Sequence, residues 1–132
     1  MNSGKTLFAQ LMAYLPWTTF SRIVTKYRGN HRVRVFPCTE HYRVMAFAQL
    51  TYRESLRDIE ASLSAHSHNL YHMGFRETVR RSTLADANEN RDWRIYAEFA
   101  QRLITQARKL YSTESLGLDL SNTVYALDST TI

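Results

Sequence analysis

The longest helical pattern in the sequence begins with RRSTLADANENRDW at residues 80–93 and continues to Tyr111. Ser82 and Thr83 are residue types that cap helix N-termini, and an acidic residue follows three positions after Thr83. Apolar residues then recur at helical spacing as far as Tyr111. We therefore predict one long helix over 83–111, with one face in a core and the opposite face in solvent.

Five shorter helical patterns precede this stretch. Apolar periodicity predicts helices over 5–15, 18–28, 39–51, 54–64 and 67–73. From Tyr42 onward the third pattern is apolar on nearly every side, which is typical of a central helix. Residues 123–127 then have the pattern of a short strand that is buried on both faces. The predicted fold class is therefore mainly α, with a short C-terminal strand.

Composition and charge narrow the class of protein. The chain has 132 residues, 44% of them hydrophobic, which favours a folded chain over a disordered one. The net charge of +5 and the sequence pI of about 9.6 suit an anionic partner such as nucleic acid. A single cysteine, Cys38, cannot form an internal disulfide, which fits a reducing compartment. No apolar run is long enough to cross a membrane and no complete signal peptide is found, so we expect a cytoplasmic protein.

Residues 52–74 have the spacing of a helix-turn-helix unit, in which 54–64 is the first helix and 67–73 the second. In such a unit, residues near the start of the second helix meet base edges in the major groove of DNA. The residues at these positions are Ser67, His68, Asn69 and His72. Asparagine can bond adenine with two hydrogen bonds, whereas serine and histidine pair less specifically. An ordinary helical hairpin is the alternative interpretation.

A basic segment precedes this unit in the chain. Residues 32–36 alternate between arginine and apolar side chains, ending at Phe36. This alternation predicts a short extended arm with Arg32 and Arg34 on one side, where both could contact phosphates. A solvated loop is the alternative that the same residues allow.

A second basic segment follows the unit. Arg76, Arg80 and Arg81 lie next to two predicted helix N-termini, which are favourable positions for phosphate oxygens. These three arginines are therefore predicted to contact DNA. The alternative is that they form local salt bridges with Glu77 and Asp86, which contribute little on a protein surface.

The sequence contains no complete active site or metal site. His68 and His72 are spaced to share a metal ion on one helix face, but no cysteine or acidic residue is well placed to complete a tetrahedral set. The one informative carboxylate is Asp128, because it directly follows the predicted strand. Functional groups of open α/β sheets gather at such strand ends.

Three segments resemble DDE-class transposases of the insertion-sequence-four group. They are FAQLTYRESLRDI at 47–59, RSTLADANENRDW at 81–93 and VYALDSTT at 124–131. They occur in the same order as in that family and span most of the chain. In that family the middle segment joins an N-terminal helical domain to the catalytic domain. The resemblance thus implies a DNA-binding domain over 1–81, a connecting helix and linker over 82–117 and the start of a catalytic domain over 118–132.

The resemblance also implies the chemistry of a complete enzyme. Residues 123–127 would form the first strand of a ribonuclease-H-like domain, and Asp128 would be the first of three catalytic acids that bind Mg²⁺. The other two acids would lie downstream of residue 132. We therefore expect the 132-residue chain to hold no cofactor and to bind DNA without cutting it.

Several functions remain open at this point. As part of a transposase, the chain would bind double-stranded DNA at the terminal inverted repeats of its element. It could also self-associate or pair with full-length transposase. The alternatives are a freestanding helix-turn-helix regulator and a helical interaction module that pairs with an intact transposase. No membrane partner is expected.

Overall fold

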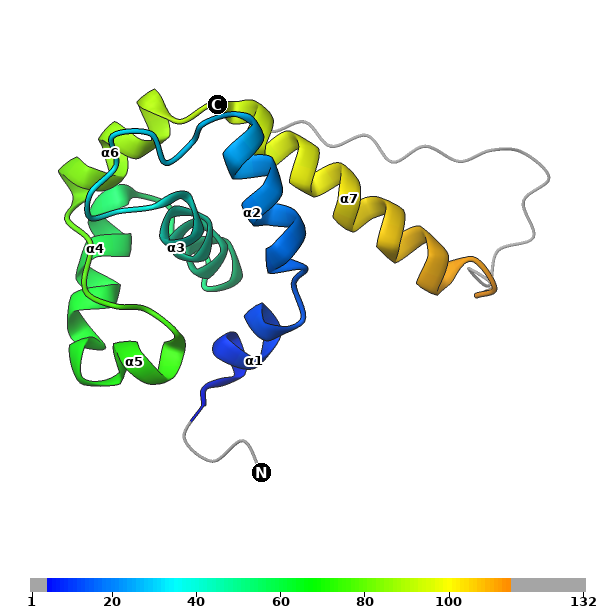
Figure 1. The fold of residues 1–132 in the computed structure, drawn as a ribbon. Helices are drawn as coiled ribbons and strands as arrows, with labels where there is room; N and C mark the ends of the chain where they lie inside the picture. The colour runs from blue at the N-terminus through cyan, green and yellow to red at the C-terminus, as the bar shows by residue number, and fades with distance from the viewer. Residues whose placement is uncertain (1–4, 115–132) are drawn as a thin grey trace.

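A computed structural model describes residues 5–114 of the chain, which form seven α-helices and one 3-10 helix (Figure 1). The elements are α1 (Leu7–Ala13), α2 (Trp17–Lys26), α3 (Cys38–Leu50), α4 (Leu56–Ala65), η1 (Ser67–Asn69), α5 (Leu70–Met73), α6 (Arg81–Asn90) and α7 (Trp93–Tyr111). These residues contain no strand, so the mainly α prediction is confirmed for this part of the chain. The predicted strand at 123–127 lies outside the described residues.

The central element is α3. In Figure 1 it runs through the middle of the body, with α4 and α6 on one side and α2 on the other, while α7 projects away. The body has two hydrophobic clusters, and α3 contributes to both. The first cluster joins α3 to α4, α5 and α6 and contains Val44, Phe47, Ala48, Ile59, Leu63, Leu70, Met73, Phe75, Val79 and Leu84. The second joins α3 to α2 and α7 and contains Phe20, Ile23, Val24, Cys38, Ile95 and Phe99.

The long helix predicted over 83–111 is instead two helices, α6 and α7. The backbone leaves the helical conformation at Arg91, whose φ and ψ are −74° and 139°. Asp92 then caps α7, because its side chain accepts a hydrogen bond from the backbone N–H of Arg94 at 3.0 Å. The Arg91 guanidinium donates to the backbone carbonyls of Gly29, at 2.8 Å, and of Phe36. These distant bonds hold the break in place.

The start of α6 also differs from the prediction. The N-cap residue is Arg80, and neither Ser82 nor Thr83 caps the helix. Instead, the carboxylate of Glu60 in α4 accepts the backbone N–H of Arg81 at 3.2 Å. The Glu60 side chain, from a neighbouring helix, therefore accepts a hydrogen bond from a backbone N–H near the helix start, a role that the sequence predicted for Ser82 or Thr83.

The other predicted helices form close to their expected bounds, with one correction. Residues 67–73 are not a single α-helix, because 67–69 form η1 and only Leu70–Met73 are α-helical. Within residues 5–114, no helix combines the length and the hydropathy that a membrane span needs.

Candidate nucleic-acid interface

The predicted helix-turn-helix unit is built by α4, η1 and α5. Ser55 begins α4, since its hydroxyl oxygen accepts the backbone N–H of Asp58 at 3.1 Å. After Ala65 the chain tightens into η1, where the backbone N–H of Asn69 donates to the carbonyl of His66 at 2.8 Å. Gly74 ends α5 with a φ of 87°, a conformation that glycine adopts without strain. Two helices joined by a tight turn are thus present at the predicted place.

The predicted base-contacting residues lie at the start of this second element. Ser67 and His68 are exposed and Asn69 is half-buried, and all three belong to η1 instead of an α-helix. His72 is exposed on α5, while its backbone carbonyl accepts the N–H of Thr6 at 3.2 Å. The second element therefore covers the predicted residues but is α-helical only over Leu70–Met73, and it presents these four residues over two short turns.

The segment with Arg32 and Arg34 is a loop and not an extended arm. Arg28 and Arg32 have φ values of 55° and 60°, so the chain turns at both positions. The side-chain oxygen of Asn30 closes the loop by accepting the backbone N–H of Cys38 at 2.8 Å. Both predicted arginines of this segment are exposed on the loop. Of the two alternatives for this segment, the structure supports the loop.

The two basic segments lie side by side. A shallow cleft of about 210 Å³ separates the loop from the segment before α6, and Val35 and Phe36 face Arg76 and Arg80 across it. Figure 1 shows the two segments running close together at the edge of the body, next to the start of α6. The fold thus brings together two segments that carry five exposed arginines. They are Arg32, Arg34, Arg76, Arg80 and Arg81. We call this set the arginine cluster.

The side chains of the arginine cluster have no carboxylate partner. Within residues 5–114, no ion pair of 4.0 Å or less involves any of the five. The predicted alternative of salt bridges to Glu77 and Asp86 is therefore not found. Arg43, by contrast, is paired with the buried Glu40 at 2.9 Å. Five exposed arginines without partners produce a positive surface that suits phosphate oxygens.

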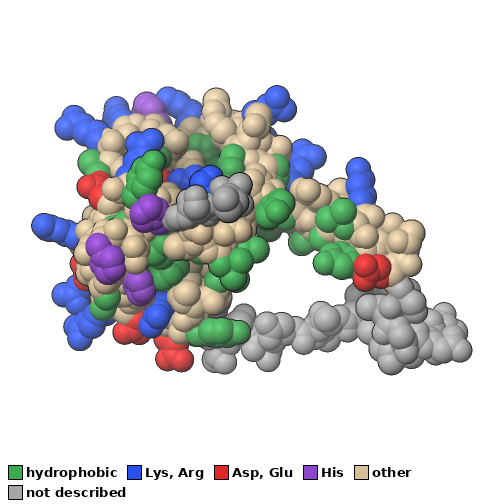
Figure 2. All heavy atoms as spheres, turned by 90° about the horizontal axis from the view of Figure 1, so that it is seen from below, with side chains coloured by type: hydrophobic (Ala, Val, Ile, Leu, Met, Phe, Trp, Pro, Cys, Tyr) green, Lys and Arg blue, Asp and Glu red, His purple; other side chains and the backbone are tan. Residues whose placement is uncertain are grey.

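Space-filling spheres show how charge is distributed on one face. In Figure 2, lysines and arginines lie around the left and upper edges, whereas apolar side chains gather toward the middle.

A buried polar network at the junction of α3, α6 and α7 was not predicted. His41 is 4% exposed, and its ring nitrogens lie 2.6 Å from the Tyr96 hydroxyl and 2.7 Å from Asn88 Oδ1. Because the amide oxygen only accepts, Nε2 carries the proton and Nδ1 accepts from Tyr96. Burial lowers the pKa of His41, so the ring stays neutral. A histidine inside the apolar 39–51 pattern was the only sign of this network in the sequence.

The described residues contain no candidate metal centre. Within residues 5–114, no three histidine, cysteine or acidic side chains converge closely enough to hold a metal ion. Asp128, the predicted catalytic and Mg²⁺-binding acid, lies outside this range.

Comparison with known families gives one match. A family model described as "Domain of unknown function (DUF4372)" matches residues 3–76, which is more than half of the chain. The match covers α1 to α5 and the loop that carries Arg32 and Arg34. No curated protein and no solved structure matches the chain.

Proposed function

We propose, on the premise that this chain belongs to the family described as a domain of unknown function (DUF4372), that it is the DNA-binding N-terminal portion of a transposase. Domains of this family are commonly found at the N-terminus of transposases. Its role would be to recognise the terminal inverted repeats of its element. By itself the chain would bind these ends without cutting them.

The arginine cluster is the observation that carries this proposal. Five exposed arginines from two separate segments share one edge of the body, and none is paired with a carboxylate in the described part of the chain. Guanidinium groups bind phosphate oxygens with charge-assisted hydrogen bonds, often two at a time. A row of such groups follows a duplex backbone, and the resulting attraction does not depend on base sequence.

Sequence preference would come from η1 and α5, which precede Arg76 in the chain. Ser67, His68 and His72 are exposed on η1 and α5, Asn69 is half-buried on η1, and all four would approach base edges. Since α5 has only four residues, we propose a shallow approach to the groove, with few direct base contacts. Base contacts would then contribute less to the binding free energy than phosphate contacts.

Catalysis would belong to a longer chain. Asp128 follows residues that resemble the first catalytic strand of DDE transposases, and carboxylates are ligands that Mg²⁺ prefers. In a chain that carries the complete catalytic domain, we expect Asp128→Asn to abolish Mg²⁺-dependent strand cleavage and to leave DNA binding intact.

Fluorescence anisotropy with labelled duplexes tests the DNA-binding role. One duplex carries a terminal inverted repeat of the transposable element that encodes the chain, and the other duplex has a shuffled sequence. The double variant Arg80→Gln/Arg81→Gln should weaken binding to both alike and reduce the slope of log affinity against log salt by about 2. Asn69→Ala should instead reduce the preference for the element end. Arg108→Gln, on the exposed C-terminal half of α7, removes one positive charge outside the cluster and is the control for such a loss.

No measurable affinity for either duplex at low salt would reject the proposed function. An unchanged salt slope in Arg80→Gln/Arg81→Gln would reject the arginine cluster as the contact surface. Equal losses on both duplexes after Asn69→Ala would remove the assignment of η1 and α5 as the element that reads bases.

An apolar groove favours a second candidate, a helical interaction module that pairs with an intact transposase. The groove, of about 660 Å³, is lined mainly by apolar residues of α3 and α7, including Tyr42, Met45, Leu50 and Trp93. Trp93 is 73% exposed and Leu50 is 53% exposed, although both are apolar. A mass measurement in solution, with the chain alone and mixed with intact transposase, separates this candidate from a monomeric DNA-binding domain.

A further inference from the structure

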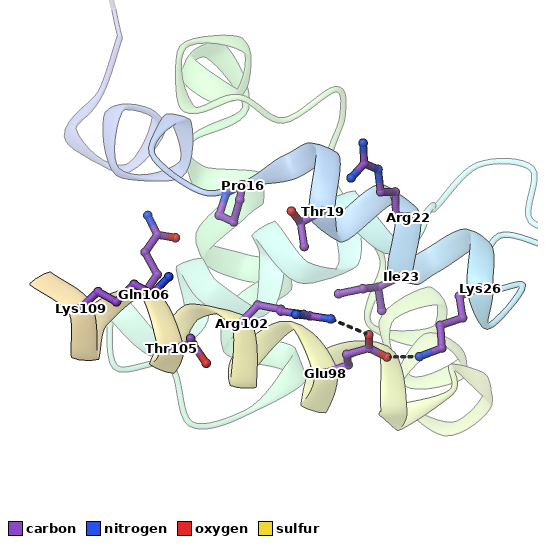
Figure 3. A pocket seen from close by; sticks show the side chains of 10 residues that line it. All are labelled: Pro16, Thr19, Arg22, Ile23, Lys26, Glu98, Arg102, Thr105, Gln106 and Lys109. Carbon is purple, nitrogen blue, oxygen red and sulfur yellow. Dashed lines mark hydrogen bonds and ion pairs between the residues drawn. The ribbon is translucent and has the colours of Figure 1, made fainter.

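A second basic surface lies on the other side of the loop that carries Arg32 and Arg34. It is a groove of about 520 Å³ between α2 and α7, which we call the α2–α7 groove (Figure 3). Its charged residues are Arg22 and Lys26 from α2 and Glu98, Arg102 and Lys109 from α7. None of these residues was among the predicted sites.

Helix geometry explains why the cations line up. Arg22 and Lys26 are four residues apart on α2, so they lie on the same face one turn from each other. Arg102 and Lys109 are seven residues apart on α7, which places them on one face two turns apart. The two helices pack through the second hydrophobic cluster, where Phe20 and Phe99 rings lie 4.9 Å apart. Because the apolar faces of the two helices pack together, the basic pair on α2 and the basic pair on α7 lie on either side of one groove.

The single carboxylate of the groove already has its partners. Glu98 accepts from Lys26 Nζ at 2.7 Å and from the Tyr27 hydroxyl at 2.9 Å, and it lies 3.8 Å from Arg102. The Lys26 ammonium is the main reason that the pKa of Glu98 is lowered, so this carboxylate is ionised at neutral pH. Four cations and one anion leave a net charge of about +3 along the groove.

Two of the cations are not explained by the contact between the helices. The ion pair between Lys26 and Glu98 links α2 to α7, so these two charged residues have a structural role in the contact between the helices. Arg22 and Lys109 form no ion pair within the described part of the chain, and both are exposed. Figure 3 shows Lys26 and Arg102 pointing toward Glu98, whereas the Arg22 side chain points away from it. The outer cations are thus available to a ligand.

We propose that the α2–α7 groove is a second contact surface for the phosphate backbone of the same DNA duplex, an inference that rests on the proposed function. The groove and the arginine cluster are linked along the chain, because α2 ends at Lys26 and the loop with Arg28, Arg32 and Arg34 follows directly. At 1.5 Å per residue, the part of α7 that lines the groove, from Glu98 to Lys109, extends about 17 Å. That length matches about 5 base pairs at 3.4 Å each. The duplex would therefore follow one basic track from the start of α6 along the loop and α7.

Lysine footprinting tests this proposal directly, since the chain has only three lysines. Lys26 and Lys109 line the groove, and Lys5 precedes α1 outside it. With saturating duplex DNA, an amine-reactive reagent should label Lys26 and Lys109 at least severalfold more slowly, while Lys5 keeps its rate. Each lysine is compared with its own rate without DNA, because the carboxylate of Glu98 raises the pKa of Lys26 and slows its reaction.

Affinity measurements give a second readout. Arg22→Gln/Lys109→Gln should reduce the salt slope of duplex binding by about 2, whereas Arg108→Gln, the neighbour of Lys109 outside the groove lining, should leave it nearly unchanged. Glu98→Gln should strengthen binding, because it removes the only negative charge among the lining residues. A variant that merely disturbed the fold would not strengthen binding.

The outcomes separate the two proposals. DNA binding with unprotected Lys26 and Lys109, or with equal salt slopes for the groove variant and Arg108→Gln, would overturn the groove contact and leave the proposed function standing. Absence of DNA binding by the unaltered chain would reject the proposed function, and the groove contact with it. Thermal unfolding monitored by circular dichroism confirms that each variant is folded.

Discussion

The two halves of α7 differ in burial although they carry the same apolar periodicity. In the first half, Ile95 and Phe99 are fully buried against α2 and α3. In the second half, Ile104 is 41% exposed and Leu110 is 70% exposed. The difference lies in what faces the helix, because within residues 5–114 no residue of α7 after Leu103 packs against either hydrophobic cluster. Periodicity therefore predicts that a helix forms, whereas burial of its face requires a partner surface.

The largest effect is expected for Phe99→Ala in the packed half. The Phe99 ring lies 4.9 Å from that of Phe20 and 5.2 Å from that of Tyr42, so its removal leaves a cavity between three helices. We expect a loss of about 3–5 kcal/mol in the free energy of unfolding. Urea unfolding followed by circular dichroism measures it, and a loss below about 1 kcal/mol would show that the first half is not a packed core.

Gly29→Ala should also damage the packed half, although Gly29 is far from α7 in the sequence. A Cβ at this position would lie 2.5 Å from Ile95 Cδ1 and 2.8 Å from Cys38 Sγ, and both side chains are buried. Such overpacking costs about 1–3 kcal/mol of unfolding free energy. Adding Ile95→Val removes the Cδ1 atom and should recover part of the lost unfolding free energy. If the double variant loses as much unfolding free energy as the two single variants together, the contact between position 29 and Ile95 is contradicted.

Acid should destabilise the same half through His41, which is hydrogen-bonded to Tyr96 of α7. Burial lowers the pKa of His41 below its ordinary value of 6.5. The unfolded state therefore binds more protons, and stability is lost as the pH falls below about 6.5. Melting temperatures between neutral pH and about pH 5 measure this loss, before most carboxylates titrate. His41→Gln should lower the melting temperature at neutral pH but flatten its pH dependence; an equally steep profile would exclude His41 as the cause.

The smallest effect is expected for Leu110→Ala in the exposed half. With 70% of Leu110 exposed, the change should alter the free energy of unfolding by no more than about 0.5 kcal/mol. The same urea experiment that measures Phe99→Ala gives this value. A loss similar to that of Phe99→Ala would mean that the second half is packed against another part of the protein.

Local patterns in the sequence predicted most of the helices close to their observed bounds. The break between α6 and α7 was missed because the groups that stabilise it are distant. Arg91 bonds to carbonyls more than fifty positions earlier in the chain. The helical periodicity on either side of Arg91 gives no indication of those hydrogen bonds.

The candidate site was predictable in its members but not in its arrangement. Arg32, Arg34, Arg76, Arg80 and Arg81 were recognisable as solvent-exposed cations from their local sequence. Their gathering at one edge depends on the tertiary fold, which places the loop beside the segment before α6. The α2–α7 groove was missed for the same reason, since each helix supplies only half of its charge.

The position of α3 between two clusters bears on how the chain emerges from a ribosome. One face of α3 belongs to the cluster that contains Leu84 and the other to the cluster that contains Phe99. Both residues are synthesised after α3, so neither hydrophobic cluster can form completely while α3 is the most recently synthesised helix. At about 5–20 residues per second, translation of the roughly 50 residues from the end of α3 to Phe99 takes about 2–10 seconds. At the start of that interval α3 has only the helices that precede it to pack against, and its face with Val44, Phe47 and Ala48 is the segment on which a nascent-chain chaperone would act.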